Sequence, residues 1–212
     1  MTRPTMSGIR FHLSALGMLA VLILAQRVWA DAPTSQPVDD TPQAFLVNVT
    51  NDVVAPMSVD QAMALVGFNP NSDKDIAGAK LLAMSIIEQS KLELAVRGKW
   101  GKDAETAVAH DCADNLPSDA ATAKWDINVD HATATFQIDS LTPMLLVNEN
   151  GHWKIDLAGY RQANATMDKD MQAATALCDR LTQDLANKDA YPAADAFIKH
   201  VKEENDKLSA AN

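Results

Sequence analysis

The spacing of apolar residues along this chain changes from helical to alternating and back, and few folds accommodate that order. Between residues 72 and 98 the period is helical: the stripe is Ile76, Ala79, Ala83, Ile86, Ile87 and Leu94, with Lys80, Glu88, Lys91 and Glu93 largely off it. From Trp125 the period is two, in WDINVD and ATATFQID, which predicts two half-buried antiparallel strands. After Gly159 the helical period returns. The order predicts an α+β protein with N-terminal helices, an antiparallel sheet and a C-terminal helical pair.

Start and stop signals place the other helices. Thr41-Pro42 opens a helix to about Val53, and Ser58 with Gln61 forms a capping box that opens a short helix through Val66, closed by Gly67. A further helix is expected from Asp103 to Cys112. The C-terminal stripes are Met167, Met171, Ala174, Leu177, Leu181 and Leu185, then Ala194, Phe197, Ile198, Val201 and Leu208 beyond Tyr191-Pro192. The short connection at residues 187–189 predicts an antiparallel pair.

The segment VNENGHWKIDL predicts a tight β-hairpin, because Asn150-Gly151 is the preferred centre of a type I′ turn. In that register Leu146 faces Ile155 and Asn148 faces Trp153. One face is then apolar, with Met144, Leu146, Trp153, Ile155 and Leu157, and the other is mixed, with Leu145, Val147, Lys154 and Asp156. Two interpretations of the apolar face stay open: it lines a ligand pocket, or it forms the floor of a core.

The first thirty residues have the form of a secretory signal peptide. Arg3 and Arg10 precede an uncharged run of 13 residues from Leu13 to Ala25, and Val28 with Ala30 gives the cleavage pattern. A spanning helix needs about 20 residues, so cleavage after Ala30 is favoured over a retained membrane anchor. Residues 31–43 predict a disordered leader. We therefore expect a periplasmic or secreted protein that is free of the membrane after cleavage, with an α+β domain at 44–160 and a helical extension at 161–212.

The charge balance argues against nucleic-acid binding. The chain has 18 basic and 28 acidic residues, and three of the basic residues lie in the expected signal peptide, which leaves 15 against 28. Such a surface repels nucleic acid and anionic lipid headgroups. Gly98-Lys99-Trp100-Gly101 has the GxxG spacing of an RNA-binding loop, but a helix C-cap explains its first glycine.

The two cysteines, Cys112 and Cys178, are expected to form a disulfide, because an exported protein lies where disulfides persist. Closing a loop of about 65 residues would stabilise the fold by roughly 3 to 4 kcal/mol. The alternative is two separate buried thiols that pack as small hydrophobes.

The helices followed by a sheet whose final hairpin reads Gly-x-Trp-Lys-Ile resemble the nuclear-transport-factor-2-like (NTF2-like) superfamily, particularly its exported bacterial, SnoaL-like members. The resemblance covers about residues 58–158 and rests on Trp125 to Asp130, Ala132 to Ile138, Pro143 to Glu149 and Gly151 to Leu157. It implies a curved sheet wrapped around the helices into a cone, and a homodimer formed through the exposed face of the sheet. Residues 161–209 depart from the family pattern and could cover either the sheet face or the cone mouth.

Common catalytic signatures do not occur in the sequence: it has no phosphate-binding glycine motif, G-x-S-x-G elbow, paired cysteine cluster or histidine pair at helical ligand spacing. No cofactor or metal is expected. His110-Asp111-Cys112 has the residue types of a cysteine nucleophile with its base, but positions i and i+2 of a helix lie about 200° apart and cannot meet. Asp130-His131 and the Glu149 to His152 turn are expected to face solvent at strand ends.

Three aromatic residues, Trp125, Phe136 and Trp153, are the best candidates for ligand contacts, with His110 and Asp126 as polar partners. Core packing is the alternative role of these aromatics. The sequence favours a non-enzymatic binding or interaction domain for an apolar small molecule or a protein partner. Two alternatives remain: an isomerase-like or lyase-like enzyme with an acid or histidine base in the cone, and a structural or protein-interaction module with a filled core.

Overall fold

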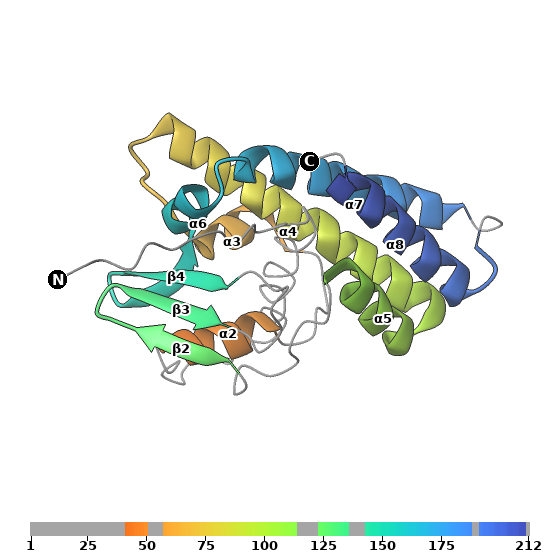
Figure 1. The fold of residues 1–212 in the computed structure, drawn as a ribbon, viewed down its shortest axis with the longest axis horizontal. Coiled ribbons are helices and arrows are strands. Elements are labelled where there is room, and N and C mark those ends of the chain that lie inside the picture. Colours follow the sequence, from red (N-terminus) through yellow and green to blue (C-terminus); the bar gives the residue numbers. More distant parts are fainter. Residues whose placement is uncertain (1–40, 51–56, 114–122, 136–142, 188–190, 211–212) are drawn as a thin grey trace, which may run out of the picture.

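A computed structural model describes residues 41–50, 57–113, 123–135, 143–187 and 191–210, without the side chains of 47–50, 109–113 and 209–210 (Figure 1). Helices and a sheet form separate layers. The first half contains α2 (Pro42–Thr50), α3 (Val59–Ala64), β1 (Val66–Gly67), α4 (Asp73–Trp100) and α5 (Lys102–Ala113). The second half contains β2 (Lys124–Ile127), β3 (His131–Thr135), β4 (Met144–Glu149), β5 (His152–Asp156), α6 (Leu157–Ala163), α7 (Met167–Ala186) and α8 (Ala194–Ala210).

The chain is a mixed helix and sheet protein with an open five-stranded sheet in the order β1-β5-β4-β3-β2. Strands β2 to β5 are antiparallel, as the alternating pattern predicts. Strand β1 is parallel to β5, with Val66 opposite Ile155, and the Ile155 N–H donates to the Leu65 carbonyl at 2.8 Å. The predicted helix through Val66, closed by Gly67, is wrong at its C-terminal end, because α3 ends at Ala64 and these two residues form β1. A strand of two residues is too short to show a period of two.

The β4–β5 hairpin has the register that its turn predicts. Leu146 pairs with Ile155 and Asn148 with Trp153. Asn150 and Gly151 have positive φ angles of 57° and 89°, the conformation that a type I′ turn requires. Leu157, expected as the last strand residue, instead begins α6, because the Asp156 side chain accepts the Gly159 N–H at 2.8 Å and caps the helix.

Capping residues fix the helices that precede the sheet. Ser58 and Gln61 form the predicted capping box at α3. The Ser72 side chain accepts the Asp75 N–H at the start of α4, and α4 continues two residues beyond Gly98, to Trp100. The Ser72 cap therefore fixes the residue at which α4 begins.

Two hydrophobic cores share α4 and α7. The first lies between the sheet and the helices α2, α3, α6 and the N-terminal halves of α4 and α7; it includes Leu46, Leu82, Ile86, Leu146, Trp153, Ile155 and Met171. The second lies among α4, α5, α7 and α8 and includes Leu92, Val96, Val108, Leu177, Cys178, Leu181, Phe197 and Val201. Because α4 has 28 residues, it is long enough to contribute to both cores.

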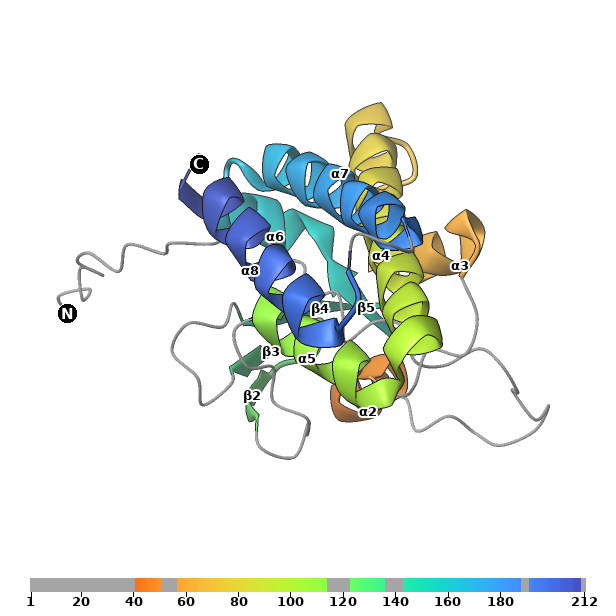
Figure 2. The same cartoon turned by 90° about the vertical axis from the view of Figure 1, so that its right-hand side faces the viewer.

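The C-terminal helices α7 and α8 pack mainly against other helices. Helix α7 packs mainly along α4, and α8 packs mainly along α5, so the four helices lie side by side (Figure 2). Met167 and Met171 at the start of α7 also belong to the first core, next to the inner face of the sheet.

Arg161 on α6 connects three helices. Its guanidinium bonds Asp75 on α4 at 2.9 Å, both carboxylate oxygens of Asp168 on α7 at 2.8 and 3.0 Å, and the Lys74 carbonyl at 3.2 Å. The guanidinium crosses α4 at Gly78, where a Cβ atom would lie 2.1 Å from its Nη2. Glycine at this position therefore makes room for the contact.

Candidate functional site: the outer face of the sheet

The inner face of the sheet is filled by protein side chains. Met144, Leu146 and Ile155 are fully buried there, and Trp153 is 8 % exposed. Leu46 of α2 and Leu82 and Ile86 of α4 belong to the same core. The inner face of β4 and β5 is therefore part of the first hydrophobic core.

The sequence-predicted ligand residues occupy different places. Trp153 is a core residue, and Trp125 is partly buried against the same core. Asp126 is exposed, and its neighbour in the strand, Trp125, faces the other side of the sheet, so the two do not line one site. Phe136 lies outside the described residues. His110 lies on α5, but its side chain is likewise outside the described part of the chain.

The opposite side of the sheet, called the outer face here, is polar around an apolar centre. Leu145 and Val147 of β4 lie at this centre and are partly buried. Leu145 also packs against the first core and against α6 near Gly159, so Val147 is the more accessible of the two. Register places the following residues on the same face: His131 and Thr133 of β3, Glu149 of β4, and His152, Lys154 and Asp156 of β5. This face is the one that the hairpin register predicted to be mixed.

Two pairs of charged or titratable side chains lie on the outer face. Lys154 Nζ lies 2.8 Å from Glu149 Oε2, and both side chains are about one-third exposed. His131 Nδ1 lies 3.4 Å from Asp156 Oδ2; the carboxylate is largely buried, while the imidazole is 56 % exposed. Lys124 and Asp126 of β2 lie on the same side of the sheet and are exposed, so this face carries charges in addition to the two pairs.

Gly67 of β1 lets the apolar centre extend to the edge of the sheet. A Cβ atom at Gly67 would lie 2.4 Å from Val147 Cγ1 and 3.0 Å from Glu149 Oε1. The side chains of Val147 and Glu149 therefore lean over β1, which a larger residue at position 67 would prevent.

Tyr160 anchors α6 to the strand that forms this centre. Its hydroxyl accepts the Leu145 N–H at 3.0 Å and donates to the Pro143 carbonyl at 3.1 Å. Burial raises the pKa of Tyr160 far above its usual range, so the hydroxyl keeps its proton and its donor role.

The His131–Asp156 pair resembles the histidine and carboxylate of a general base, in which the carboxylate orients the imidazole. Two observations argue against that role. The 3.4 Å separation exceeds the roughly 2.7–2.9 Å of a charge-assisted N–H···O bond, and the imidazole is mostly exposed to water. The pair is better described as a long polar contact between β3 and β5. Sequence reasoning missed this pair, because local turn chemistry sets the register of β4 and β5 but leaves that of β3 and β4 open.

A second set of polar residues lies within α4, between the two cores. Glu88 and Glu93, which lie largely off the predicted apolar stripe, are nevertheless buried, at 9 % and 5 % exposed. Glu93 accepts from Gln89 Nε2 at 2.9 Å, and Glu88 pairs with Lys91 at 2.7 Å. The central position of α4 in the molecule buries side chains on nearly every side of the helix, which an amphipathic pattern does not reveal.

Cys178 on α7 is a free, buried thiol in this structure. Burial, together with the nearby carboxylates of Glu93 and Glu88, raises the pKa of this thiol far above its usual range. The side chain of Cys112 lies outside the described residues, so its pairing with Cys178 stays a prediction.

Thiol labelling and mass measurement test the state of Cys178. After a phosphine reductant is added to the folded protein at pH 8, we expect iodoacetamide to leave Cys178 unlabelled, because the thiolate is the nucleophile and burial suppresses it. In guanidinium the same residue should be labelled at once. The intact mass before reduction, lower by two hydrogens if a bridge to Cys112 exists, decides the disulfide. Rapid labelling of Cys178 in the folded state would contradict the buried position.

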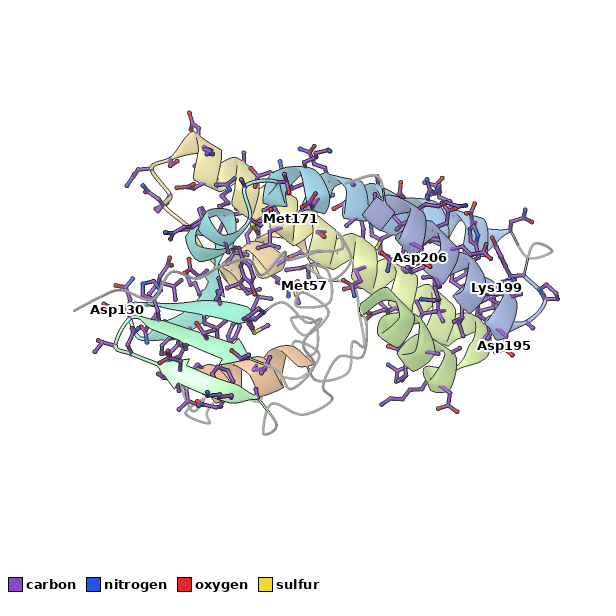
Figure 3. The ribbon with its side chains drawn as sticks, in the orientation of Figure 1. Met57, Asp130, Met171, Asp195, Lys199 and Asp206 are labelled. Atoms are coloured by element: carbon purple, nitrogen blue, oxygen red, sulfur yellow. The ribbon has the colours of Figure 1, made fainter. Side chains whose placement is uncertain are left out.

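The other histidine–carboxylate pair of the described residues lies in the helical layer. His200 of α8 is 3.4 Å from Asp184 of α7, and its ring stacks on Tyr191 at 5.4 Å. Figure 3 shows Asp195, at the start of α8, at the opposite end of the molecule from Asp130, at the tip of the β2–β3 hairpin. This pair holds two helices together away from the sheet.

Within the part of the chain that the structure describes, no three His, Cys, Asp or Glu side chains are grouped to hold a metal ion. The described helices also include none with the length and apolar character needed to cross a membrane. Comparison with family models, with curated proteins and with solved structures found no match to this chain.

Proposed function

We propose that this chain is an exported, non-enzymatic interaction protein of NTF2-like architecture that binds a second copy of itself through the outer face of its sheet. The observation that supports self-association is the composition of that face. Leu145 and Val147 form an apolar centre, and Glu149–Lys154 and His131–Asp156 surround it as paired charges.

The NTF2-like architecture is supported by the way the helices meet the sheet. Helices α2 and α3 and the first half of α4 pack against the inner face through Leu46, Ala62 and Leu82. The final hairpin, with Trp153 pointing into that core, is the segment on which the sequence resemblance rests. The resemblance implies a homodimer formed through the exposed face of the sheet, and the proposal applies that expectation to this chain.

A second copy suits the outer face because a two-fold interface brings one surface against itself. A face with unpaired charges would then meet like charges, at a cost in free energy. Next to Val147, Glu149 already has the Lys154 ammonium beside it at 2.8 Å, so the centre of the face can lose water without leaving Glu149 unpaired. Charges elsewhere on the acidic chain interact weakly, because physiological salt screens them beyond about 8 Å.

The test compares two Val→Lys variants of the mature chain by sedimentation equilibrium. Val147→Lys places a charge at the centre of the outer face, and we expect it to weaken dimerisation by about 30-fold or more, equivalent to about 2 kcal/mol for an unpaired buried charge. Val129→Lys is the matched control, because Val129 is 87 % exposed in the β2–β3 connection. It should dimerise like the unmodified chain.

A second variant guards against a folding defect in Val147→Lys. Lys154→Glu leaves the apolar centre intact but puts a second acid beside Glu149, so each outer face becomes negative and the two copies repel. Far-UV circular dichroism should show all variants folded. A chain that stays monomeric at high micromolar concentration, or a dimer that tolerates both Val147→Lys and Lys154→Glu, would overturn the proposed function.

A further inference from the structure

We propose that the edge strand β2 pairs with β2 of a second copy of this chain, so that the two sheets join into one. The contact uses the edge of the sheet, whereas the proposed function uses its outer face, so the inference does not depend on that function. It starts from the position of β2, the last strand in the order β1-β5-β4-β3-β2. Figures 1 and 2 both show β2 at the rim of the sheet, away from α7.

Strand β2 has backbone hydrogen-bonding groups that point away from the rest of the sheet. The Asn128 N–H donates to the His131 carbonyl of β3 at 2.9 Å. Because bonded and non-bonded pairs alternate along an antiparallel ladder, the N–H and C=O of the preceding residue, Ile127, are directed away from β3. Ile127 is also 45 % exposed. Such an edge is a template for another strand.

Two devices that commonly block an edge strand do not occur in β2. Its sequence, KWDI, contains no proline, and its four residues pair with consecutive residues of β3, so no bulge turns the edge away. Lys124 is a third device, because a lysine on an edge repels the lysine of a second copy. Asp126 reverses that effect, because it supplies the opposite charge two residues further along the same face.

The charges of β2 are self-complementary in one antiparallel register. Lys124 and Asp126 are both exposed, and no ion pair joins either of them to another residue in the described part of the chain. A two-fold pairing centred on position 125 places Lys124 opposite the partner's Asp126, and Asp126 opposite the partner's Lys124. Both opposite-charge pairs stabilise the contact. Shifting the centre to position 124 or 126 places like charges opposite each other, so the charges select this register.

A second copy is the partner that this edge fits, because the same strand supplies both the backbone groups and the matching charges. The contact is small: four residues cover far less than the roughly 1,200 Å² of a stable specific interface. Edge pairing is therefore weak, with an expected dissociation constant of roughly 0.1–1 mM. At low micromolar concentration the outer-face dimer predominates.

The test isolates the edge in the mature Val147→Lys chain, in which the outer face is disabled, and measures sedimentation equilibrium at about 0.5 mM protein. Lys124→Asp or Asp126→Lys, added singly, should weaken association at least about tenfold, because each change places two like-charge pairs across the contact. An equal mixture of the two variants should regain the original affinity, because every aspartate then faces a lysine. Far-UV circular dichroism should show all variants folded.

Lys199→Asp is the matched control, because it makes the same change of charge on the exposed surface of α8. Figure 3 shows Lys199 at the opposite end of the molecule from Asp130, which lies at the tip of the β2–β3 hairpin. This variant should associate as the Val147→Lys chain does. The Lys154→Glu chain provides a second background in which the outer face is disabled.

The outcomes separate the edge contact from the proposed function. A Val147→Lys chain that is monomeric at about 0.5 mM, while the unmodified chain dimerises, would overturn the edge contact and leave the proposed function intact. So would a mixture that associates no better than its two components. If Val147→Lys and the unmodified chain associate equally and the mixture restores association, the edge contact is confirmed and the proposed function fails. If neither chain associates, both are wrong.

Discussion

Replacing Trp153 with alanine is expected to lower the free energy of unfolding by about 3–5 kcal/mol, the usual cost of removing a large aromatic residue from a core. Trp153 is 8 % exposed and packs in one cluster with Met144, Leu146 and Ile155. The loss is that of the buried indole surface plus the cavity left among fully buried neighbours. Urea denaturation followed by circular dichroism measures it, with an unchanged slope as the sign of a single cooperative transition.

Trp125→Ala is the matched control for this prediction. Trp125 lies on the same side of the sheet but on the edge strand β2, and it is only partly buried. Its replacement should cost less than about half as much, since less apolar area returns to water. A Trp153→Ala variant as stable as the unmodified protein would contradict the filled core. It would instead indicate that Trp153 lines an open ligand site, as one interpretation of the sequence proposed.

The second large effect is that of Gly78→Ala on the free energy of unfolding. We expect this change to destabilise the chain that has Arg161 and to stabilise the chain in which Arg161 is replaced by alanine. In the unmodified chain, Gly78→Ala should destabilise by about 1–2 kcal/mol, because the new Cβ would displace the Arg161 guanidinium from its two carboxylates. In an Arg161→Ala background, the same Gly78→Ala change should stabilise by about 0.5–1 kcal/mol, the normal gain from replacing a helix-interior glycine. A double-mutant cycle by urea denaturation measures the difference.

Gly98→Ala supplies the control for that cycle. A Cβ atom at Gly98 meets nothing within 4 Å, and the residue lies in the last turns of α4. Its replacement should stabilise the protein by up to about 1 kcal/mol in both backgrounds. If Gly78→Ala stabilised the unmodified chain as much as Gly98→Ala does, the guanidinium could not lie across α4 at position 78.

The elements with strong local signals could be predicted from the sequence. The capping box of Ser58 and Gln61, the Ser72 start of α4 and the turn at Asn150-Gly151 each depend on contacts within a few residues. The hairpin register then followed, and with it the two faces of β4 and β5. Such features need no knowledge of distant segments.

Features that depend on distant segments could not be predicted. Strand β1 exists because Val66 and Gly67 lie beside β5, about 90 residues further along the chain. Glu88 and Glu93 are buried because α4 is enclosed by both neighbouring helices and the sheet, although their spacing alone suggests a solvated surface. The contact between His131 and Asp156 depends on the β3–β4 and β4–β5 registers together.

The mass of the native mature chain, purified from a bacterial host and measured alongside its denatured mass, tests the central claim most directly. The denatured mass shows whether cleavage follows Ala30. The proposal predicts a native species of twice the denatured mass with no additional component, because the inner face is filled and the outer face binds a second copy. A native monomer that retains a small apolar molecule would contradict it, and would place the binding site inside the sheet instead of on its outer face.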